Sequence, residues 1–322
     1  MKVDFLSSIT LARALYVAAS LDIASLLQDK KMNITELAFV LSVDKDSLER
    51  LLVFLELHEV FKKTTDGDYY NNEFSETMSL NHPHTIRPFL LHDDETRWNA
   101  FGNLEYSIKT GKPAFDALYH MGYFDYLTKH PQLSLRFDQA MTFISSQEDL
   151  LIAQMVPFNG VIADIGGGNG QLLKKIIDYN KTKVTEVVLF DLPSVLDAAQ
   201  PTNFKKVVGS FFEPLDIRAD FFILKRVLHD WKDEEALSIL RNVAEAMQPD
   251  SHLYIFEGVL DCVKDKKALA AIDLLLLTLL GGKERTLENF QQLLQDARLV
   301  LIEHKNITDI MSVLVCKKSG SN

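Results

Sequence analysis

The pattern of apolar and polar positions changes near residue 155. Before that point apolar residues recur every three or four positions, which predicts helices. The predicted N-terminal helices span residues 9–27, 33–41 and 46–59. Asn33 begins a capping box for the second helix, and Asp66-Gly67 between two short apolar runs indicates a hairpin. Three helices and a hairpin predict a winged-helix domain, which we place at residues 1–88.

Beyond residue 155 short β-rich runs alternate with amphipathic stretches. Such alternation is typical of a doubly wound α/β domain with a mainly parallel sheet. We therefore expect an N-terminal all-helical or winged-helix domain, then connecting helices and a lid at residues 89–150. A Rossmann-like domain is expected at residues 151–322.

The composition of the chain excludes several classes of function but does not by itself indicate a particular one. The 322 residues carry a formal net charge of -11 and two cysteines. The negative balance argues against general nucleic-acid binding, and two cysteines provide neither a disulfide framework nor a zinc motif. We see no leader peptide, and the most apolar run, residues 268–280, is shorter than a bilayer span. We expect a cytoplasmic protein that binds neither nucleic acid nor membrane.

Residues 46–59 would be the DNA-reading helix of a winged-helix domain. A reader helix normally presents Lys or Arg to phosphates and base edges. Here Glu49, Glu56 and Glu59 outnumber Arg50. We interpret the domain as a packing or dimerisation module, whose Ala- and Leu-rich first helix is buried by a second subunit.

A glycine run follows a predicted buried strand at residues 161–165 and opens a helix. Strand, glycine turn and helix form the nucleotide-binding arrangement of a doubly wound sheet, because glycine lets the backbone approach a ligand. Gly166, Gly168 and Gly170 follow the spacing G-x-G-x-G, which differs from the dinucleotide pattern G-x-G-x-x-G. The preceding Asp164 would disfavour a pyrophosphate and suit an ammonium group.

Asp191 ends the next predicted strand, residues 186–190, about 20 residues beyond the glycine turn. An acidic residue at this spacing takes the ribose hydroxyls of a nucleotide. Asp164 and Asp191 together favour a nucleoside with a cationic amino-acid tail over a nicotinamide dinucleotide.

His229 follows an apolar strand at residues 219–225, which predicts that it lies at the ligand-binding edge of the sheet. An imidazole of pKa near 6.5 suits removal of a proton from a phenol of pKa about 10. Such a base works best when a carboxylate fixes its tautomer. Glu257, at the end of the strand 253–256, and Glu284 are both candidates. The alternative for Glu284 is a salt-bridged loop carboxylate.

Residues 115–126 hold an aromatic cluster, and Phe137, Met141 and Ile144 share one face of a later helix. Core packing explains each of these residues singly. As a group they would equally form the apolar lid of a pocket for a flat ligand.

Four motifs occur in order along the chain. They are residues 164–170, Phe190-Asp191-Leu192-Pro193, Leu228-His229-Asp230-Trp231 and residues 281–286. In these motifs the chain resembles the plant caffeate-type O-methyltransferases and their bacterial relatives, which methylate polyketide and other phenolic metabolites. The similarity covers nearly all 322 residues.

The resemblance implies S-adenosylmethionine as the cofactor and a hydroxyl of a small aromatic molecule as the acceptor. The direct transfer that we expect requires no metal, and the sequence contains no metal-binding motif. It implies a homodimer with interlocked N-terminal domains, and His229 as a base flanked by the two glutamates. It places Lys225 near the cofactor carboxylate, Asp230 beside the active site and Trp231 against the adenine.

Three positions depart from the family pattern. The third cofactor motif, usually acidic, is Gly209-Ser210-Phe211-Phe212, so its contact to adenine lacks a charge. The Phe-Asn-x-x-Met helix appears with Asp138 in place of Asn. Leu279-Leu280 replaces the Asn-Pro of plant members, which predicts a more apolar acceptor.

The predicted site has three parts. Its catalytic residues are His229, Glu257 and Glu284. Its cofactor-binding residues are Asp164, Gly166, Gly168, Asp191, Leu192, Ser210, Phe211, Lys225 and Trp231. Its acceptor-binding residues are Phe137, Met141, Asp230, Asp273 and Leu280.

Two other functions stay open at this point. A protein of this kind could bind S-adenosylmethionine yet catalyse N- or C-methylation or a cyclisation. It could also be a winged-helix regulator that senses S-adenosylmethionine, although the acidic reader helix and the complete catalytic set argue against this.

Overall fold

The chain divides into two compact units. The computed structural model describes residues 5–180, 183–198 and 204–320. One unit, which we call the N-terminal unit, comprises Met1–Trp98 and Gln132–Ile144. The other, the sheet unit, comprises Asn99–Pro131 and Ser145–Asn322. Among the described residues, no helix is long and apolar enough to cross a bilayer.

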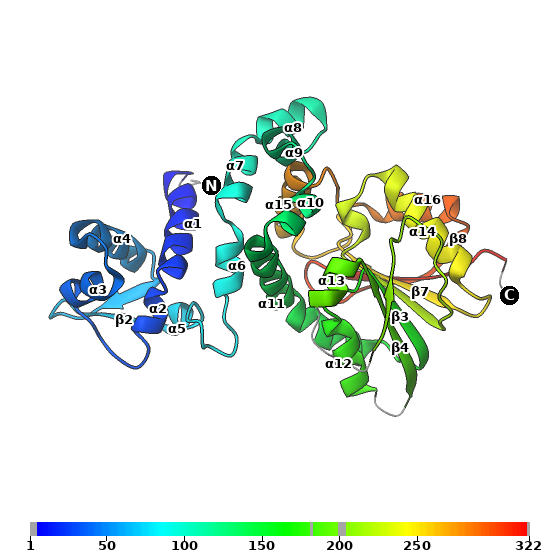
Figure 1. The fold of residues 1–322 in the computed structure, drawn as a ribbon, viewed down its shortest axis with the longest axis horizontal. Coiled ribbons are helices and arrows are strands. Elements are labelled where there is room, and N and C mark those ends of the chain that lie inside the picture. The colour runs from blue at the N-terminus through cyan, green and yellow to red at the C-terminus, as the bar shows by residue number, and fades with distance from the viewer. Residues whose placement is uncertain (1–4, 181–182, 199–203, 321–322) are drawn as a thin grey trace. The chain divides into compact units, whose positions relative to one another are not determined.

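The N-terminal unit has the predicted order of helices and hairpin (Figure 1). It contains α1 (Phe5–Ser20), α2 (Ile23–Leu26), α3 (Ile34–Leu41), α4 (Lys45–Leu57), the antiparallel pair β1 (Phe61–Lys63) and β2 (Tyr69–Asn71), α5 (Glu73–Glu76) and α6 (Arg87–His92), and α7 (Glu95–Gly102) follows. Asn33 caps α3 in the predicted capping box, and Asp44 caps α4. The single helix predicted at residues 9–27 is instead two helices, because Asp22 has a left-handed backbone conformation (φ 55°).

The predicted connecting segment, residues 89–150, is shared between the two units. Helices α8 (Leu104–Thr110), α9 (Ala114–Tyr119) and α10 (Tyr123–Lys129) belong to the sheet unit, where α8 and α9 pack against α15 (Lys266–Leu279). Helix α11 (Pro131–Met155) contributes its first half to the N-terminal unit and its second half to the sheet unit. Helical periodicity shows where a helix forms but leaves its packing partner undefined.

The sheet unit is built on a seven-stranded sheet within the described residues. Its strands are β3 (Gly160–Ile165), β4 (Val184–Asp191), β5 (Lys205–Val208), β6 (Phe221–Lys225), β7 (His252–Glu257), β8 (Leu299–Asn306) and β9 (Ser312–Lys318). Their order across the sheet is β5-β4-β3-β6-β7-β9-β8. The first five strands of this order run parallel, and β9 is antiparallel to β7 and β8. The doubly wound α/β fold expected from the sequence is confirmed.

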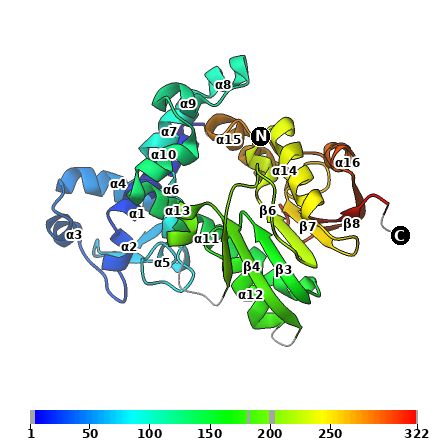
Figure 2. The same cartoon turned by 45° about the vertical axis from the view of Figure 1, so that its right-hand side comes forward.

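Helices cover both faces of this sheet (Figures 1 and 2). On one face, α14 (Asp233–Ala246) and α16 (Leu287–Asp296) contribute Leu240 and Phe290 to the core. On the other face, the second half of α11, α12 (Gln171–Tyr179) and α13 (Pro193–Ala198) contribute residues such as Leu173. Neighbours along a strand alternate between the two cores, as Ile162 and Ala163 do. Burial on both faces explains why the central strands have nearly continuous apolar sequences.

The strand order reverses at β3, which has β4 on one side and β6 on the other. In open α/β sheets, ligands bind beside the carboxyl ends of the strands at such a switch point. At or next to these ends lie Asp164 on β3, Asp191 on β4, Lys225 on β6 and Glu257 on β7. The fold therefore brings four predicted site residues to one edge of the sheet.

Candidate active site

The glycine turn after β3 leaves space close to the backbone. Gly168 has a left-handed conformation (φ 60°), and a Cβ atom built there would meet nothing within 4 Å. The Gly168 N–H donates to Asp191 Oδ2 (2.8 Å), and the Leu192 N–H donates to Asp191 Oδ1 (2.7 Å). These two donors fix the Asp191 carboxylate and leave its other lone pairs for hydroxyl groups.

Asp164 lies almost completely buried next to this turn. Burial, with the neighbouring Asp149 as the next contributor, raises the pKa of the Asp164 carboxyl to about 7. A cation in the site would favour the ionised carboxylate, because an opposite charge lowers the pKa of an acid. Asp149, Asp164 and Asp191 outnumber Lys225 here, so the site suits a cationic group.

Lys225 and Arg226, at the end of β6, pair with two acids of α11. Lys225 Nζ lies 2.7 Å from Asp149 Oδ1 and 3.4 Å from Glu148 Oε2. The Arg226 guanidinium binds both oxygens of Glu148, at 3.2 and 2.5 Å. All four side chains are largely buried. The charge of Lys225, which the resemblance placed near a cofactor carboxylate, is thus already paired within the chain.

Three aromatic rings gather beyond the ends of β5 and β6. The Phe211 and Phe212 rings lie 5.9 and 4.7 Å from the Trp231 ring, each in an edge-to-face arrangement. Phe211 also adjoins the glycine turn, since a Cβ atom on Gly166 would lie 3.4 Å from its ring. Ser210 Oγ accepts the Phe212 N–H at 3.3 Å and closes a local turn. Phe212 was not among the predicted site residues, although it is adjacent to Phe211.

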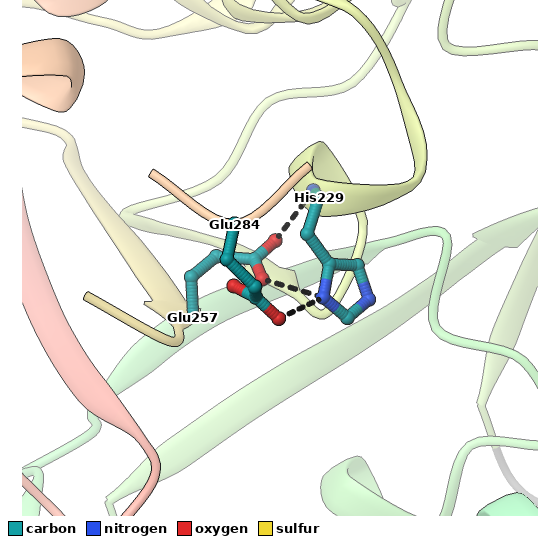
Figure 3. A group of neighbouring side chains, drawn as sticks. All are labelled: His229, Glu257 and Glu284. Carbon is teal, nitrogen blue, oxygen red and sulfur yellow. Dashed lines mark hydrogen bonds and ion pairs between the residues drawn. The ribbon is translucent and has the colours of Figure 1, made fainter. Parts of the chain in front are cut away.

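His229 lies on the 3₁₀ turn η1 (Leu228–Asp230), directly after β6. Its Nδ1 atom lies 2.9 Å from Glu284 Oε1 and 3.5 Å from Glu257 Oε2. Figure 3 shows both carboxylates on the Nδ1 side of the imidazole ring. The opposite atom, Nε2, lies 3.5 Å from Asp230 Oδ1. A neutral ring whose proton is held on Nδ1 by Glu284 presents the Nε2 lone pair as a base.

Glu257, completely buried at the end of β7, holds the backbone of this turn. Its Oε1 atom accepts the N–H groups of Val227, Leu228 and His229, at 2.9, 2.8 and 3.4 Å. The two predicted partners of His229 therefore make different contacts. Glu284 is closer to the ring, whereas Glu257 binds the main chain that carries it.

The surrounding carboxylates make His229 a strong base. Burial alone would lower the pKa of the imidazole, but Glu257, Asp230 and Glu284 raise it to about 9. Burial raises the pKa of Asp230 to about 7 and also raises the pKa of Glu257. Because a phenol has a pKa of about 10, proton transfer from a phenol to this imidazole is nearly balanced.

The predicted acceptor-binding residues are found in both units. Asp273 of α15 accepts the Glu284 N–H through Oδ1 at 2.7 Å, so it holds the segment of Glu284. Leu280 is the C-cap of the same helix. Phe137 and Met141 lie in the half of α11 that belongs to the N-terminal unit, where the Phe137 ring is 5.5 Å from His92. A role in acceptor binding stays a prediction for these residues.

His229, Glu257 and Glu284 also form the one group of three potential metal ligands in the described part of the chain, with ligand atoms within 4.8 Å of one another. Hydrogen bonds account for this proximity, since His229 Nδ1 is hydrogen-bonded to Glu284 and Glu257 binds the N–H groups of the turn. We interpret the group as a hydrogen-bonded base. That no metal takes part stays a prediction.

The doubly wound fold and the switch point of its sheet are typical of proteins that bind a nucleotide or a nucleoside beside the strand ends, and a histidine held by carboxylates lies at this edge. Comparison with protein families then identifies the chain. The O-methyltransferase domain matches residues 101–299, and the O-methyltransferase dimerisation domain matches residues 3–80. The chain belongs to this family of S-adenosylmethionine-dependent O-methyltransferases.

The relatives of the chain include bacterial O-methyltransferases. The chain is 32% identical to the phenazine O-methyltransferase of Lysobacter antibioticus over 292 residues, which cover 87% of this chain and 85% of the relative. It is 30% identical to the mitomycin biosynthesis 6-O-methyltransferase of Streptomyces lavendulae over 309 residues, or 92% and 87% of the two chains. A solved O-methyltransferase from neocarzinostatin biosynthesis, in complex with S-adenosylmethionine and 2-hydroxy-5-methyl naphthoic acid, superposes with a TM-score of 0.81 at 29% identity, covering 96% of each chain.

Proposed function

We propose that the chain transfers the methyl group of S-adenosylmethionine to a hydroxyl of a small aromatic molecule, with His229 as the general base. The observation that carries the proposal is the 2.9 Å contact between His229 Nδ1 and Glu284 at the carboxyl edge of the sheet. This contact leaves Nε2 as the basic atom of the ring, on the opposite side from the two glutamates.

The residues at the same edge fit the cofactor. Asp191 offers its free lone pairs to the ribose hydroxyls, and the rings around Trp231 offer an apolar wall to the adenine. The excess of carboxylates near Asp164 suits the cationic groups of the cofactor. When bound, S-adenosylmethionine would supply an electrophilic methyl group on a positively charged sulfur, and the break of the carbon–sulfur bond would release S-adenosylhomocysteine as a neutral thioether.

In this mechanism the acceptor hydroxyl donates a hydrogen bond to His229 Nε2. His229 takes the hydroxyl proton as the oxygen forms its bond to the methyl group. Glu284 stabilises the resulting imidazolium through the Nδ1–H. Glu257 keeps the ring in place by holding three N–H groups of the turn.

The relatives support an aromatic acceptor. One is named for a phenazine, and the solved relative holds a naphthoic acid. The apolar Leu279-Leu280 pair at the end of α15 supports an acceptor with few polar groups on the ring that faces this helix.

We further propose that the chain is a homodimer. Residues 3–80 match the dimerisation domain of the family. Helix α1 exposes Leu6, Ile9 and Val17 by 77%, 45% and 37%, and an apolar surface of this kind is stabilised when another surface covers it. Analytical ultracentrifugation should therefore show a species of twice the 36.5 kDa chain mass. A monomer at micromolar concentration would contradict the proposal.

Two measurements test the activity. In isothermal titration calorimetry, S-adenosylmethionine and S-adenosylhomocysteine should both bind with micromolar dissociation constants, whereas ATP, which shares the adenosine, should not. Methyl transfer from radiolabelled S-adenosylmethionine is then measured on hydroxynaphthoates and hydroxyphenazines and on the matched ring compounds with an amine in place of the hydroxyl. Transfer to the hydroxyl compounds supports O-methylation, and transfer to the amines alone would contradict it.

A further inference from the structure

Arg285, which directly follows Glu284, is a completely buried guanidinium. A buried charge is costly unless its donors find partners. Nη1 donates to the carbonyl of Leu228 (2.7 Å), and Nη2 donates to the carbonyl of Trp231 (2.8 Å). Nε donates to Asp233 Oδ1 (3.0 Å). Two of the three bonds are therefore made to the main chain rather than to another charge.

These two main-chain bonds bracket His229. Leu228 precedes it and Trp231 lies two residues after it, so one planar group holds the carbonyls on both sides of the base. The Lys283 N–H donates to the His229 carbonyl itself, at 2.9 Å. Three hydrogen bonds, to the carbonyls of Leu228, His229 and Trp231, thus join the turn to the segment that carries Glu284.

Glu257 and Arg285 bind complementary main-chain groups of the turn. Glu257 accepts the N–H groups at its start, and Arg285 donates to its carbonyls. A single helical turn leaves most of its own N–H and C=O groups without internal partners. These two side chains supply further partners for the N–H groups of Val227, Leu228 and His229 and for the carbonyls of Leu228 and Trp231, and so define where the turn lies. A lysine could not replace the arginine, because one ammonium nitrogen lacks the fork of donors of a guanidinium.

We propose that Arg285 is a positioning residue for methyl transfer, which clamps the turn of His229 to the segment of Glu284 and thereby sets the hydrogen bond between these two residues. The proposal rests on the proposed role of His229 as the base. Arg285 acts through His229 and Glu284, and a misplacement of about 1 Å of a catalytic group costs about 10²-fold in rate.

The variant Arg285→Lys tests this proposal, because it keeps the positive charge and loses the fork. Histidine-selective NMR of the full chain reports the titration of His229, whose signal is assigned by its loss in His229→Gln. The carboxylates hold the pKa of His229 at about 9 in the wild type. In Arg285→Lys it should fall toward the ordinary value of about 6.5. On the alkaline plateau, where His229 is unprotonated in both proteins, we expect kcat to fall by about 10²-fold, with a smaller change in KM.

Asp233→Asn is a second variant, which we expect to fold even if Arg285→Lys does not, because the Asp233 side chain is 52% exposed. It replaces the ionised partner of Arg285 Nε by a neutral amide oxygen, which weakens this hydrogen bond. The pKa of His229 should therefore fall in the same direction by a smaller amount. Lys283→Met is the matched control. Its side chain bonds the same carboxylate, Asp233 Oδ2 at 2.5 Å, rather than the carbonyls of the turn, so the titration of His229 should not change.

A double-mutant cycle with Glu284→Gln separates positioning from a general loss of stability. If Arg285 acts through the contact between His229 and Glu284, the two variants should have less than additive effects on log kcat. Independent effects, or an unchanged His229 titration in both Arg285→Lys and Asp233→Asn, would overturn the proposal. The titration of His229 requires no methyl transfer, so it tests the positioning role of Arg285 independently of the reaction. Failure of the proposed base mechanism would be seen separately, as full turnover of His229→Gln.

Discussion

The Nδ1 atom of His229 lies 2.9 Å from Glu284 Oε1 but 3.5 Å from Glu257 Oε2. A neutral imidazole has only one N–H, and the closer carboxylate accepts the hydrogen bond from it. Glu284 therefore sets the tautomer in which Nε2 is the free base. Glu257 sets the place of the ring through the main chain. The two carboxylates have separate tasks and are not interchangeable.

His229→Gln should remove the base and keep a polar side chain in the turn. We expect turnover to fall by about 10²- to 10⁴-fold, because the acceptor must then lose its proton to solvent. Calorimetry should show unchanged binding of S-adenosylmethionine. His252→Gln, at the opposite end of the sheet on β7, is the control and should keep full turnover. Near-normal turnover of His229→Gln would remove the base from the mechanism.

Turnover should rise with pH into the alkaline range. The base works only in its unprotonated form, and Glu257, Asp230 and Glu284 raise the pKa of His229 to about 9 against the effect of burial. The logarithm of kcat should therefore increase with pH and level off above about pH 9. Single-turnover rates at saturating cofactor and acceptor measure this directly. A plateau that begins below neutral pH would show that a different group limits the reaction.

Asp191→Asn should weaken binding of the cofactor. The side chain keeps its size, but its amide cannot accept hydrogen bonds at both ends from the Gly168 and Leu192 N–H groups and also from hydroxyls. Loss of charged hydrogen bonds predicts an affinity for S-adenosylmethionine about 10- to 100-fold lower. Asp197→Asn, an exposed carboxylate on α13, is the matched control in calorimetry. Equal affinities for the two variants would exclude Asp191 from the cofactor site.

Glu148→Gln should destabilise the fold. It breaks a buried, bidentate ion pair and leaves the Arg226 guanidinium short of a counter-charge, at a cost of about 3–5 kcal/mol in the free energy of unfolding. Glu105→Gln breaks the exposed pair with Lys109 and should cost less than about 0.5 kcal/mol. Urea unfolding of both variants measures the difference. Similar costs for the two would mean that solvent screens the buried pair.

The ion pair between Glu148 and Arg226 also predicts how the stability of the protein changes in acid. Burial would raise the pKa of Glu148, but Arg226 and Lys225 hold it below its usual value. A depressed pKa in the folded state gives stability that is present above the unfolded value and is lost as the pH falls through the folded one. The wild type should therefore lose stability in acid below about pH 4.3, and Glu148→Gln should lose less.

Much of the site could be predicted because its residues lie at the ends of elements that are encoded locally. A glycine run after an apolar strand defines a turn, and Asp191, His229 and Glu257 each end or follow a strand whose apolar sequence is visible. The cap of α3 by Asn33 was predictable for the same reason, since a capping box depends on neighbouring residues alone.

The acids of α11 could not be predicted from local sequence. Asp149 and Lys225 are 76 residues apart, and Glu148 and Arg226 are 78 apart. The adjacent acids of α11 and the adjacent bases at the end of β6 indicate that ion pairs could form between them. Helical periodicity, however, does not show which strand end a helix packs against. The helix break at Asp22 was not predicted, because Leu21 and Ile23 continue the apolar pattern across it. The left-handed conformation of Asp22 is a property of the backbone, which the pattern of apolar side chains does not report.

Gly282 limits how this enzyme could diversify. A Cβ atom at this position would lie 2.1 Å from the carbonyl oxygen of His229, so any side chain there would displace the base. Leu280, two residues earlier, is under no such restriction. We therefore expect new substrates to be accepted through substitutions around the turn of His229. Gly282 and the turn itself should stay the same in such variants.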